Sequence, residues 1–104
     1  MKQLYKVIIE PTVHNERKKL PGHVRQRVKQ AISDLALQPR SHSSEPLDVA
    51  DLDVPNTVEL RRTKIDRWRL VYAVNDTEGW VWVWGIHERP PYDYDDLEAF
   101  ASRL

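Results

Sequence analysis

The spacing of apolar residues divides the chain into a helical first half and a strand-rich second half. A short apolar run, LYKVIIE, stops before Pro11 and predicts a first strand. Thr12 is placed to cap a short helix over residues 13–19, and Pro21 suits the first turn of a longer helix that runs to Gln38. Helical spacing of apolar residues indicates this longer helix: Val24, Val28, Ala31, Ile32 and Leu35. Its apolar face should pack on a sheet.

The second half is dominated by strand-like runs. Residues 41–56 are polar and interrupted by prolines, which predicts a loop. Three runs follow, namely TVELRR (57–62), RWRLVYAV (67–74) and GWVWVWGI (79–86), and the last two should form an antiparallel hairpin through NDTE. In the tail, Asp93 is placed to cap a short helix through Leu97 and Phe100. The pattern predicts a single α+β domain over residues 1–104.

Residue parity predicts how these strands face the helices. Alternate side chains of a strand share a face, so the run at 67–74 separates into a bulky apolar set and a set of arginines with small residues. The bulky set should meet the helices: Trp68, Leu70, Tyr72 and Val74. If no bulge intervenes, the bulky set of the next run should join it: Trp80, Trp82, Trp84 and Ile86. The second face would then hold Arg67, Arg69, Val71, Ala73, Val81, Val83, Gly85, His87 and Arg89.

This second face has the composition of a shallow site for an anion. Small side chains would form its floor, arginines its rim, and Gly85 leaves room. The alternative is an ordinary strand rim in which Arg67 and Arg69 pair with Asp66 or Glu59. The alternating tryptophans are explained more simply as a buried sheet face than as a surface that stacks bases.

Charge is segregated along the chain although its formal net charge is zero. The excess is +6 over residues 1–40, −5 over 41–60, +4 over 61–75 and −5 over 76–104. A local polyanion-binding face is therefore compatible with the neutral total, although solvated helix faces are also commonly charged. With no apolar run near the roughly 20 residues of a membrane helix, no leader-like segment and no cysteine, a soluble cytoplasmic protein is expected.

Signals for metal or nucleotide chemistry are weak. The four histidines show no spacing that would place two of them beside a carboxylate on one face. The three glycines form no phosphate-binding loop. We therefore expect neither a metal nor a cofactor.

Three segments of the second half carry a family resemblance. They are RLVY at residues 69–72, VWVWGIHER at 81–89, and the tyrosine at position 92. In this order and spacing, after a strand and two helices, the chain resembles the RelE/ParE superfamily of bacterial type II toxins. The resemblance implies a RelE-like α+β fold in which an N-terminal strand and a two-helix hairpin pack on one face of an antiparallel sheet, with a short C-terminal helix.

The resemblance also implies a specific activity. RelE-type toxins cut messenger RNA in the ribosomal A site by attack of a ribose 2′-OH on the neighbouring phosphate, without a metal. Carried over residue by residue, Arg69 and Arg89 would stabilise the phosphate and Tyr92 would be the acid or base, with His87 as a rival because it titrates near neutrality. Nearby cations would bind RNA: Arg61, Arg62, Lys64 and Arg67. A cognate antitoxin is the implied protein partner.

Two departures keep other functions open. Enzymatic members usually carry basic residues early on the strand before the central one, where this chain has Thr57 and Glu59, and its tail YDYDDLE is acidic. Fewer cations weaken docking on ribosomal RNA. The alternatives are a ParE-like inhibitor of DNA gyrase and a non-catalytic family member that acts only as a binding module.

Overall fold

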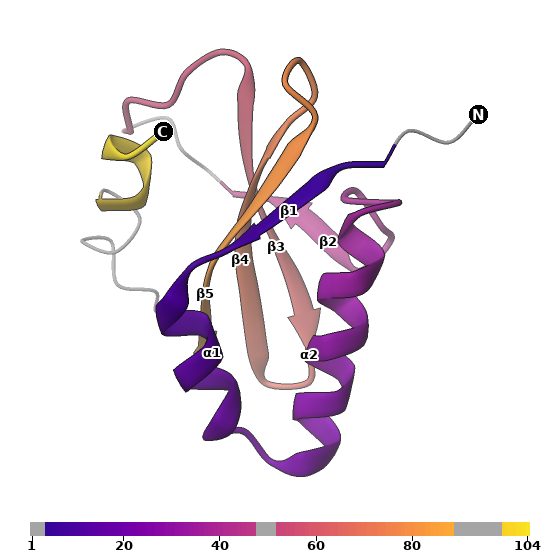
Figure 1. Ribbon diagram of the computed structural model, residues 1–104. Helices are drawn as coiled ribbons and strands as arrows, with labels where there is room; N and C mark the ends of the chain where they lie inside the picture. Colours follow the sequence, from indigo (N-terminus) through magenta and orange to yellow (C-terminus); the bar gives the residue numbers. More distant parts are fainter. Residues whose placement is uncertain (1–3, 48–51, 89–98) are drawn as a thin grey trace.

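A five-stranded sheet carries two helices on one of its faces in the computed structural model (Figure 1). The structure describes residues 4–47, 52–88 and 99–104. The first half contains strand β1 (Lys6–Ile9) and helices α1 (Pro11–Lys18) and α2 (Gly22–Leu35). The second half contains β2 (Ser44–Pro46), β3 (Val58–Ile65), β4 (Trp68–Asn75) and β5 (Trp80–Glu88). The expected α+β, RelE-like arrangement is confirmed.

The strand order is β1-β5-β4-β3-β2, so the central strand β4 lies between two long antiparallel neighbours. The sheet is antiparallel as expected except at one edge, where the N-terminal strand β1 joins it and pairs with β5 in parallel. The connection after β1 explains this parallel pairing. It contains both helices, and a connection of this length can bring the chain back to the sheet in the same direction. At the other edge, β2 forms inside the segment that the polar composition predicted as a loop, and it pairs with β3.

Prolines set the helix starts more strongly than the predicted cap. Pro11 occupies the first turn of α1 behind Glu10, so Thr12 lies inside the helix and does not cap it. Pro21 is the N-cap residue of α2, whose first helical residue is Gly22. The ring of proline fixes φ near the helical value and lacks the N–H that a first turn leaves unpaired anyway, which explains both positions.

The main core lies between the helices and the sheet. From α2 it takes the predicted apolar stripe, and Val24, Val28, Ile32 and Leu35 are all buried. From β4 it takes the predicted bulky set, with Leu70, Tyr72 and Val74 at the centre and Trp68 at the margin. The parity prediction for β4 is therefore confirmed.

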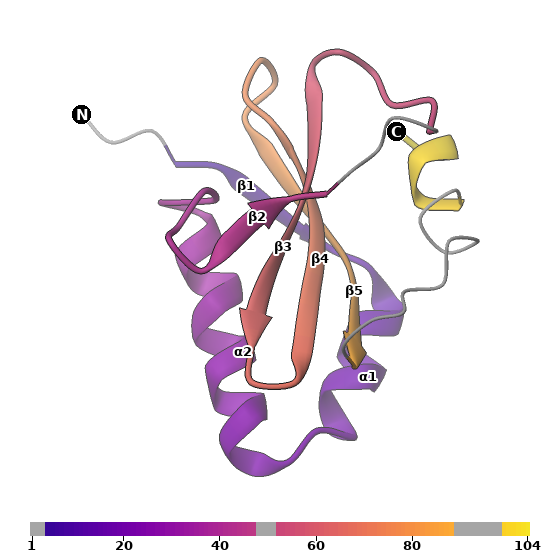
Figure 2. The same cartoon turned by 180° about the vertical axis from the view of Figure 1, so that it is seen from behind.

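The parity prediction for β5 was wrong for the tryptophans. Val81 and Val83 face the helices and are fully buried, whereas the three tryptophans lie on the opposite face, which we call the outer face (Figure 2 shows the sheet from behind). Alternation alone cannot say which of two apolar sets faces the helices, and the smaller valines fit against them. On the outer face the indole N–H groups also find hydrogen-bond acceptors. Trp82 Nε1 donates to Glu10 at 2.9 Å, and Trp80 Nε1 donates to Glu78 at 2.8 Å.

A bulge in β5 then reverses the alternation. Tyr72 is opposite Val83 while Val71 is opposite Gly85, so Trp84 is an additional residue between them. Bulges re-aim the side chains that follow. After this one, Ile86 enters the helix-side core opposite Leu70, and the next residue turns to the outer face.

A second cluster of apolar residues covers the tryptophan end of the outer face. A helical turn over residues 99–102 places Phe100, which is fully buried, parallel to Trp84 with ring centroids 4.6 Å apart. Arg103 lies 5.1 Å from the ring centroids of Trp82 and Trp84 and pairs with Glu10 at 3.1 Å. The described turn fits the expected short C-terminal helix, while its predicted cap Asp93 and Leu97 lie outside the described residues.

Candidate functional site

The other end of the outer face carries a group of nitrogen-bearing side chains that we call the cationic cluster: Arg62, Lys64, Arg69 and His87. Their strands bring them together, because Lys64 is opposite Arg69 on β3 and β4, and Arg69 is opposite His87 on β4 and β5. Directly opposite residues share a face, with Cβ atoms roughly 5 Å apart. Arg62 is the next outer-face residue of β3, opposite Val71. Three of the four residues thus form a row across three strands.

Arg69 is held firmly within this row. Only 8% of the residue is exposed, and its Nη1 donates to the backbone oxygens of Asp66 at 3.1 Å and Trp68 at 3.0 Å. Its Nε is buried and has no hydrogen-bond partner within the described residues. A buried guanidinium N–H without a partner is costly. The geometry therefore holds the charge of Arg69 at a fixed place in the row.

The turn that holds Arg69 is a two-residue connection between β3 and β4. Ile65 pairs with Trp68, which leaves Asp66 and Arg67 in the loop, and Asp66 has a φ of 58°. Aspartate tolerates this left-handed conformation better than most residues. Arg67 projects into solvent and pairs with Glu88 at 3.2 Å, with 63% of its side chain exposed. Arg67 thus fits the rim alternative, whereas Arg69 forms no ion pair with the carboxylate of Asp66 or Glu59 and fits the site.

Glu45 reports the electrostatic character of this surface. It lies opposite Arg62 across the β2–β3 ladder, and the two side chains form an ion pair at 2.9 Å. The hydrogen bond from Arg62 holds the pKa of Glu45 below its ordinary value, and the charges of Arg62, Lys64 and Arg69 act in the same direction. The outer face at this end therefore stabilises a negative charge.

Arg61, which the sequence grouped with the RNA-binding cations, is placed apart from them. It is opposite Tyr72 on the helix side of the sheet and is only 8% exposed. Its Nε and Nη2 donate to Ser44 Oγ at 3.3 and 2.9 Å, and its Nη1 donates to Glu59 at 3.0 Å. These contacts give Arg61 a structural part in holding β2 against β3.

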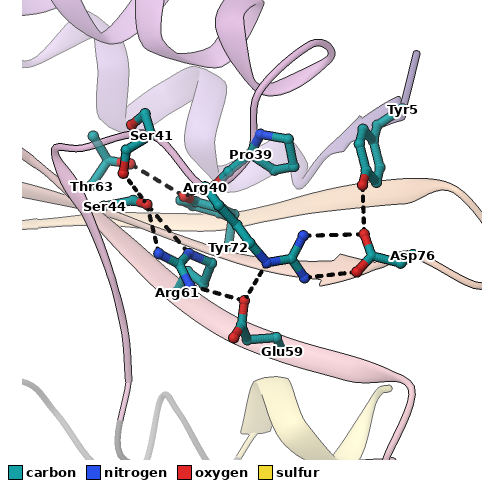
Figure 3. A network of polar contacts seen from close by, with 10 residues as sticks. All are labelled: Tyr5, Pro39, Arg40, Ser41, Ser44, Glu59, Arg61, Thr63, Tyr72 and Asp76. Atoms are coloured by element: carbon teal, nitrogen blue, oxygen red, sulfur yellow. Dashed lines mark hydrogen bonds and ion pairs between the residues drawn. The ribbon is translucent and has the colours of Figure 1, made fainter. Parts of the chain in front are cut away.

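Arg61 belongs to a polar network that the sequence did not reveal (Figure 3). Arg40 joins Glu59 at 2.9 Å to Asp76 at 3.1 and 2.9 Å, and Tyr5 donates to Asp76 at 2.5 Å. The hydrogen bond from Tyr5 and then that from Arg40 lower the pKa of Asp76. The network connects the N-terminal segment, β3 and the β4–β5 turn, and residues so far apart in sequence carry no local signal of such a contact.

The contrast between Arg61 and Arg62 makes a test of these assignments. Replacing Arg61 by alanine should lower the free energy of unfolding by about 1–3 kcal/mol, because buried polar partners lose their hydrogen bonds. Replacing the more exposed Arg62 should cost less than about 1 kcal/mol, as for a surface ion pair. Urea denaturation of both variants measures the difference. Equal losses would contradict the structural part assigned to Arg61.

Two of the predicted catalytic residues, Arg89 and Tyr92, lie outside the described residues. Their parts in the site stay predictions. Within the described ranges, no group of three or more histidine or acidic side chains is arranged to hold a metal ion. Nor is any helix in those ranges long and apolar enough to span a membrane.

Comparison with known proteins gives a family and a fold. The sequence profile described as "ParE toxin of type II toxin-antitoxin system, parDE" matches residues 7–89. A chain of the archaeal RelE–RelB complex from Pyrococcus horikoshii matches with a TM-score of 0.71 at 19% identity, covering 88% of this chain and 100% of that one. A free mutant of the E. coli toxin RelE matches with a TM-score of 0.64 at 20% identity, covering 97% and 99%. Comparison with curated proteins gave no significant match. At these identities the structural likeness establishes the fold alone.

Proposed function

This chain belongs to the ParE toxin family of type II toxin–antitoxin systems, within the RelE/ParE superfamily, and we propose that it cleaves messenger RNA on the ribosome. The observation that carries the proposal is the row formed by Lys64, Arg69 and His87 on one open sheet face. In that row, the buried Nε of Arg69 lacks a partner within the described residues. A site that stabilises anions beside an imidazole, which can accept or donate a proton, suits phosphodiester cleavage.

The reaction needs no reactant besides the RNA. A base takes the proton of the 2′-OH, the 2′-oxygen bonds to the adjacent phosphorus, and the bond from phosphorus to the 5′-oxygen breaks as that oxygen receives a proton. The products are a 2′,3′-cyclic phosphate and a 5′-OH. Arg69 would stabilise the charge that accumulates on the phosphate, with Lys64 and Arg62 beside it. His87 would transfer one of the protons, and Arg89 and Tyr92 would complete the site.

The structure shows where the acidic and basic residues of β3 lie relative to the cationic cluster. Glu59 lies on the helix side of β3, where it contacts Arg40 and Arg61, so its charge does not face the cluster. The outer-face positions of the same strand include Arg62 and Lys64. The basic residues expected on this strand are thus supplied further along it, which supports the endonuclease over a non-catalytic binding module.

Gyrase inhibition is the second candidate function, because the matching profile is that of ParE. The deciding experiment is translation of a defined message in a cell-free system, with and without the protein, followed by mapping of new RNA ends. A gyrase supercoiling assay runs in parallel. New ends that require ribosomes support the endonuclease. Intact message together with inhibited supercoiling would establish the gyrase alternative, and inactivity in both assays would leave the chain as a binding module.

We also propose that a cognate antitoxin binds the toxin in the cytoplasm, where both would be made. Similar structures include toxins solved in complex with RelB antitoxins. An acidic segment of such a partner would find complementary charge around Arg62, Arg67 and Arg69, whereas Arg61, which the sequence grouped with them, is buried on the helix side and bonded to Ser44 and Glu59. The partner to test is the product of the reading frame next to the toxin gene.

Charge reversal on the outer face tests this contact. Changing Arg62 and Arg67 together to glutamate should weaken antitoxin binding about tenfold or more, because close charge pairs across interfaces commonly couple by more than 1.4 kcal/mol. Titration calorimetry measures the affinity. Arg25→Glu with Arg27→Glu, both on the exposed side of α2, is the control with the same charge change. Equal weakening by both pairs, or by neither, would contradict the proposed contact.

A further inference from the structure

We infer that Gly85 is a positioning residue that seats the imidazole of His87 on the outer face. A Cβ at position 85 would lie 3.1 Å from Nε2, 3.6 Å from Cε1 and 3.8 Å from Cδ2 of His87. The imidazole ring is therefore folded back along β5 and lies against the α-carbon of Gly85. We call this contact between the His87 ring and Gly85 the seat. Its effect on catalysis rests on the proposed function, whereas the contact itself does not.

The glycine is explained by space and not by backbone conformation. Among the described residues, Gly79 is the glycine with positive φ, so the backbone of Gly85 is one that alanine can also adopt. Apart from chain neighbours, the three atoms nearest to the added Cβ all belong to the His87 ring. Glycine inside a strand costs stability and often marks a close approach of another group. Here the group that approaches is the ring of His87.

The bulge and the glycine act together on this ring. The additional residue Trp84 brings Gly85 and His87 onto the outer face, opposite Val71 and Arg69 respectively. Folding back toward Gly85 draws the ring away from the strand end at Glu88 and toward the interior of the sheet. The ring thus lies against Gly85, on the face that also carries Arg69. A side chain at position 85 would push Nε2 outward.

Replacing Gly85 by alanine tests the seat. Because the added methyl meets only the far end of a movable side chain, the variant should fold with nearly the stability of the parent. Its kcat for ribosome-dependent cleavage should fall about tenfold with little change in KM, since small misplacements of a reacting group are costly in rate. Gly22→Ala is the matched control, because the nearest atom to its added Cβ is 4.0 Å away, and it should cleave like the parent.

A double-mutant cycle separates positioning from a general structural effect. Added to His87→Ala, the Gly85→Ala change should have no further effect on kcat, because its action runs through the ring. A loss that persists in the His87→Ala background would overturn the inference.

Nuclear magnetic resonance of the histidine rings gives a reading that does not depend on cleavage. In Gly85→Ala, the ring signals of His87 should shift, and those of His14, His23 and His42 should not. If the parent cuts no message but the His87 signals shift, the proposed function fails and the seat stands. Unchanged His87 signals would overturn the seat whatever the activity of the parent.

Discussion

Replacing Arg69 by alanine should reduce message cleavage by about 10²–10³-fold, the usual loss when one preorganised charge contact is removed from a transition state. The residue is suited to this part because it is 8% exposed and fixed by two backbone oxygens of the adjoining turn. A cation that is already fixed loses little entropy when charge develops on the phosphate. Induction of the variant should therefore no longer arrest growth, and the cell-free assay should show few new RNA ends.

Two further substitutions separate the contribution of the charge from that of the guanidinium shape. Arg69→Lys keeps the charge but loses the planar guanidinium, whose Nη1 donates to the backbone oxygens of Asp66 and Trp68, so its activity should fall between those of the parent and the alanine variant. Arg67→Ala removes an exposed arginine next to the site and should weaken activity only partially. Circular dichroism and thermal denaturation establish that each variant is folded. If Arg69→Ala is as toxic as the parent, the endonuclease proposal fails and gyrase inhibition becomes the better explanation.

Replacing Ile32 by alanine should lower the free energy of unfolding by about 2–5 kcal/mol, the range for truncating a buried large aliphatic side chain. Ile32 is 7% exposed and belongs to the cluster formed with Leu70 and Tyr72 of the central strand. The loss combines the transfer of apolar surface to water with the cavity that remains.

Leu37 provides the matched control for Ile32. It follows α2, but 50% of it is exposed, so Leu37→Ala should change stability by less than about 0.5 kcal/mol. Thermal and urea denaturation of the two variants measure the contrast. An Ile32→Ala variant that melts like the parent would mean that α2 does not pack on the sheet face described here.

The elements of this protein could be predicted because their signals are local. Helix α2 follows from apolar residues that recur at helical spacing, and the β4 face follows from alternation between bulky apolar residues and arginines. The same alternation placed Arg69 on the face away from the helices, as found. These inferences needed only the geometry of a single helix or strand.

The arrangement of the site depended on contacts between strands, which no local pattern contains. In β5 both alternating sets are apolar, so periodicity does not indicate whether the valines or the tryptophans face the helices. The valines do, because the smaller side chains pack against the helices. The bulge at Trp84 shifts the register of β5 against β4 by one residue, and no pattern within β5 alone indicates it. Arg61 and Arg62 are neighbours in sequence, yet pleating sends one to a buried network and the other to the anion-binding face. By itself the sequence determined the two helices, the four longer strands and the face that Arg69 occupies, but not the short strand β2. Parity also placed His87 on that face, but through an uninterrupted alternation. Only the tertiary structure decided that the tryptophans share this face and that the bulge at Trp84 turns His87 toward it, because pairing across strands brings together residues that are distant in the chain.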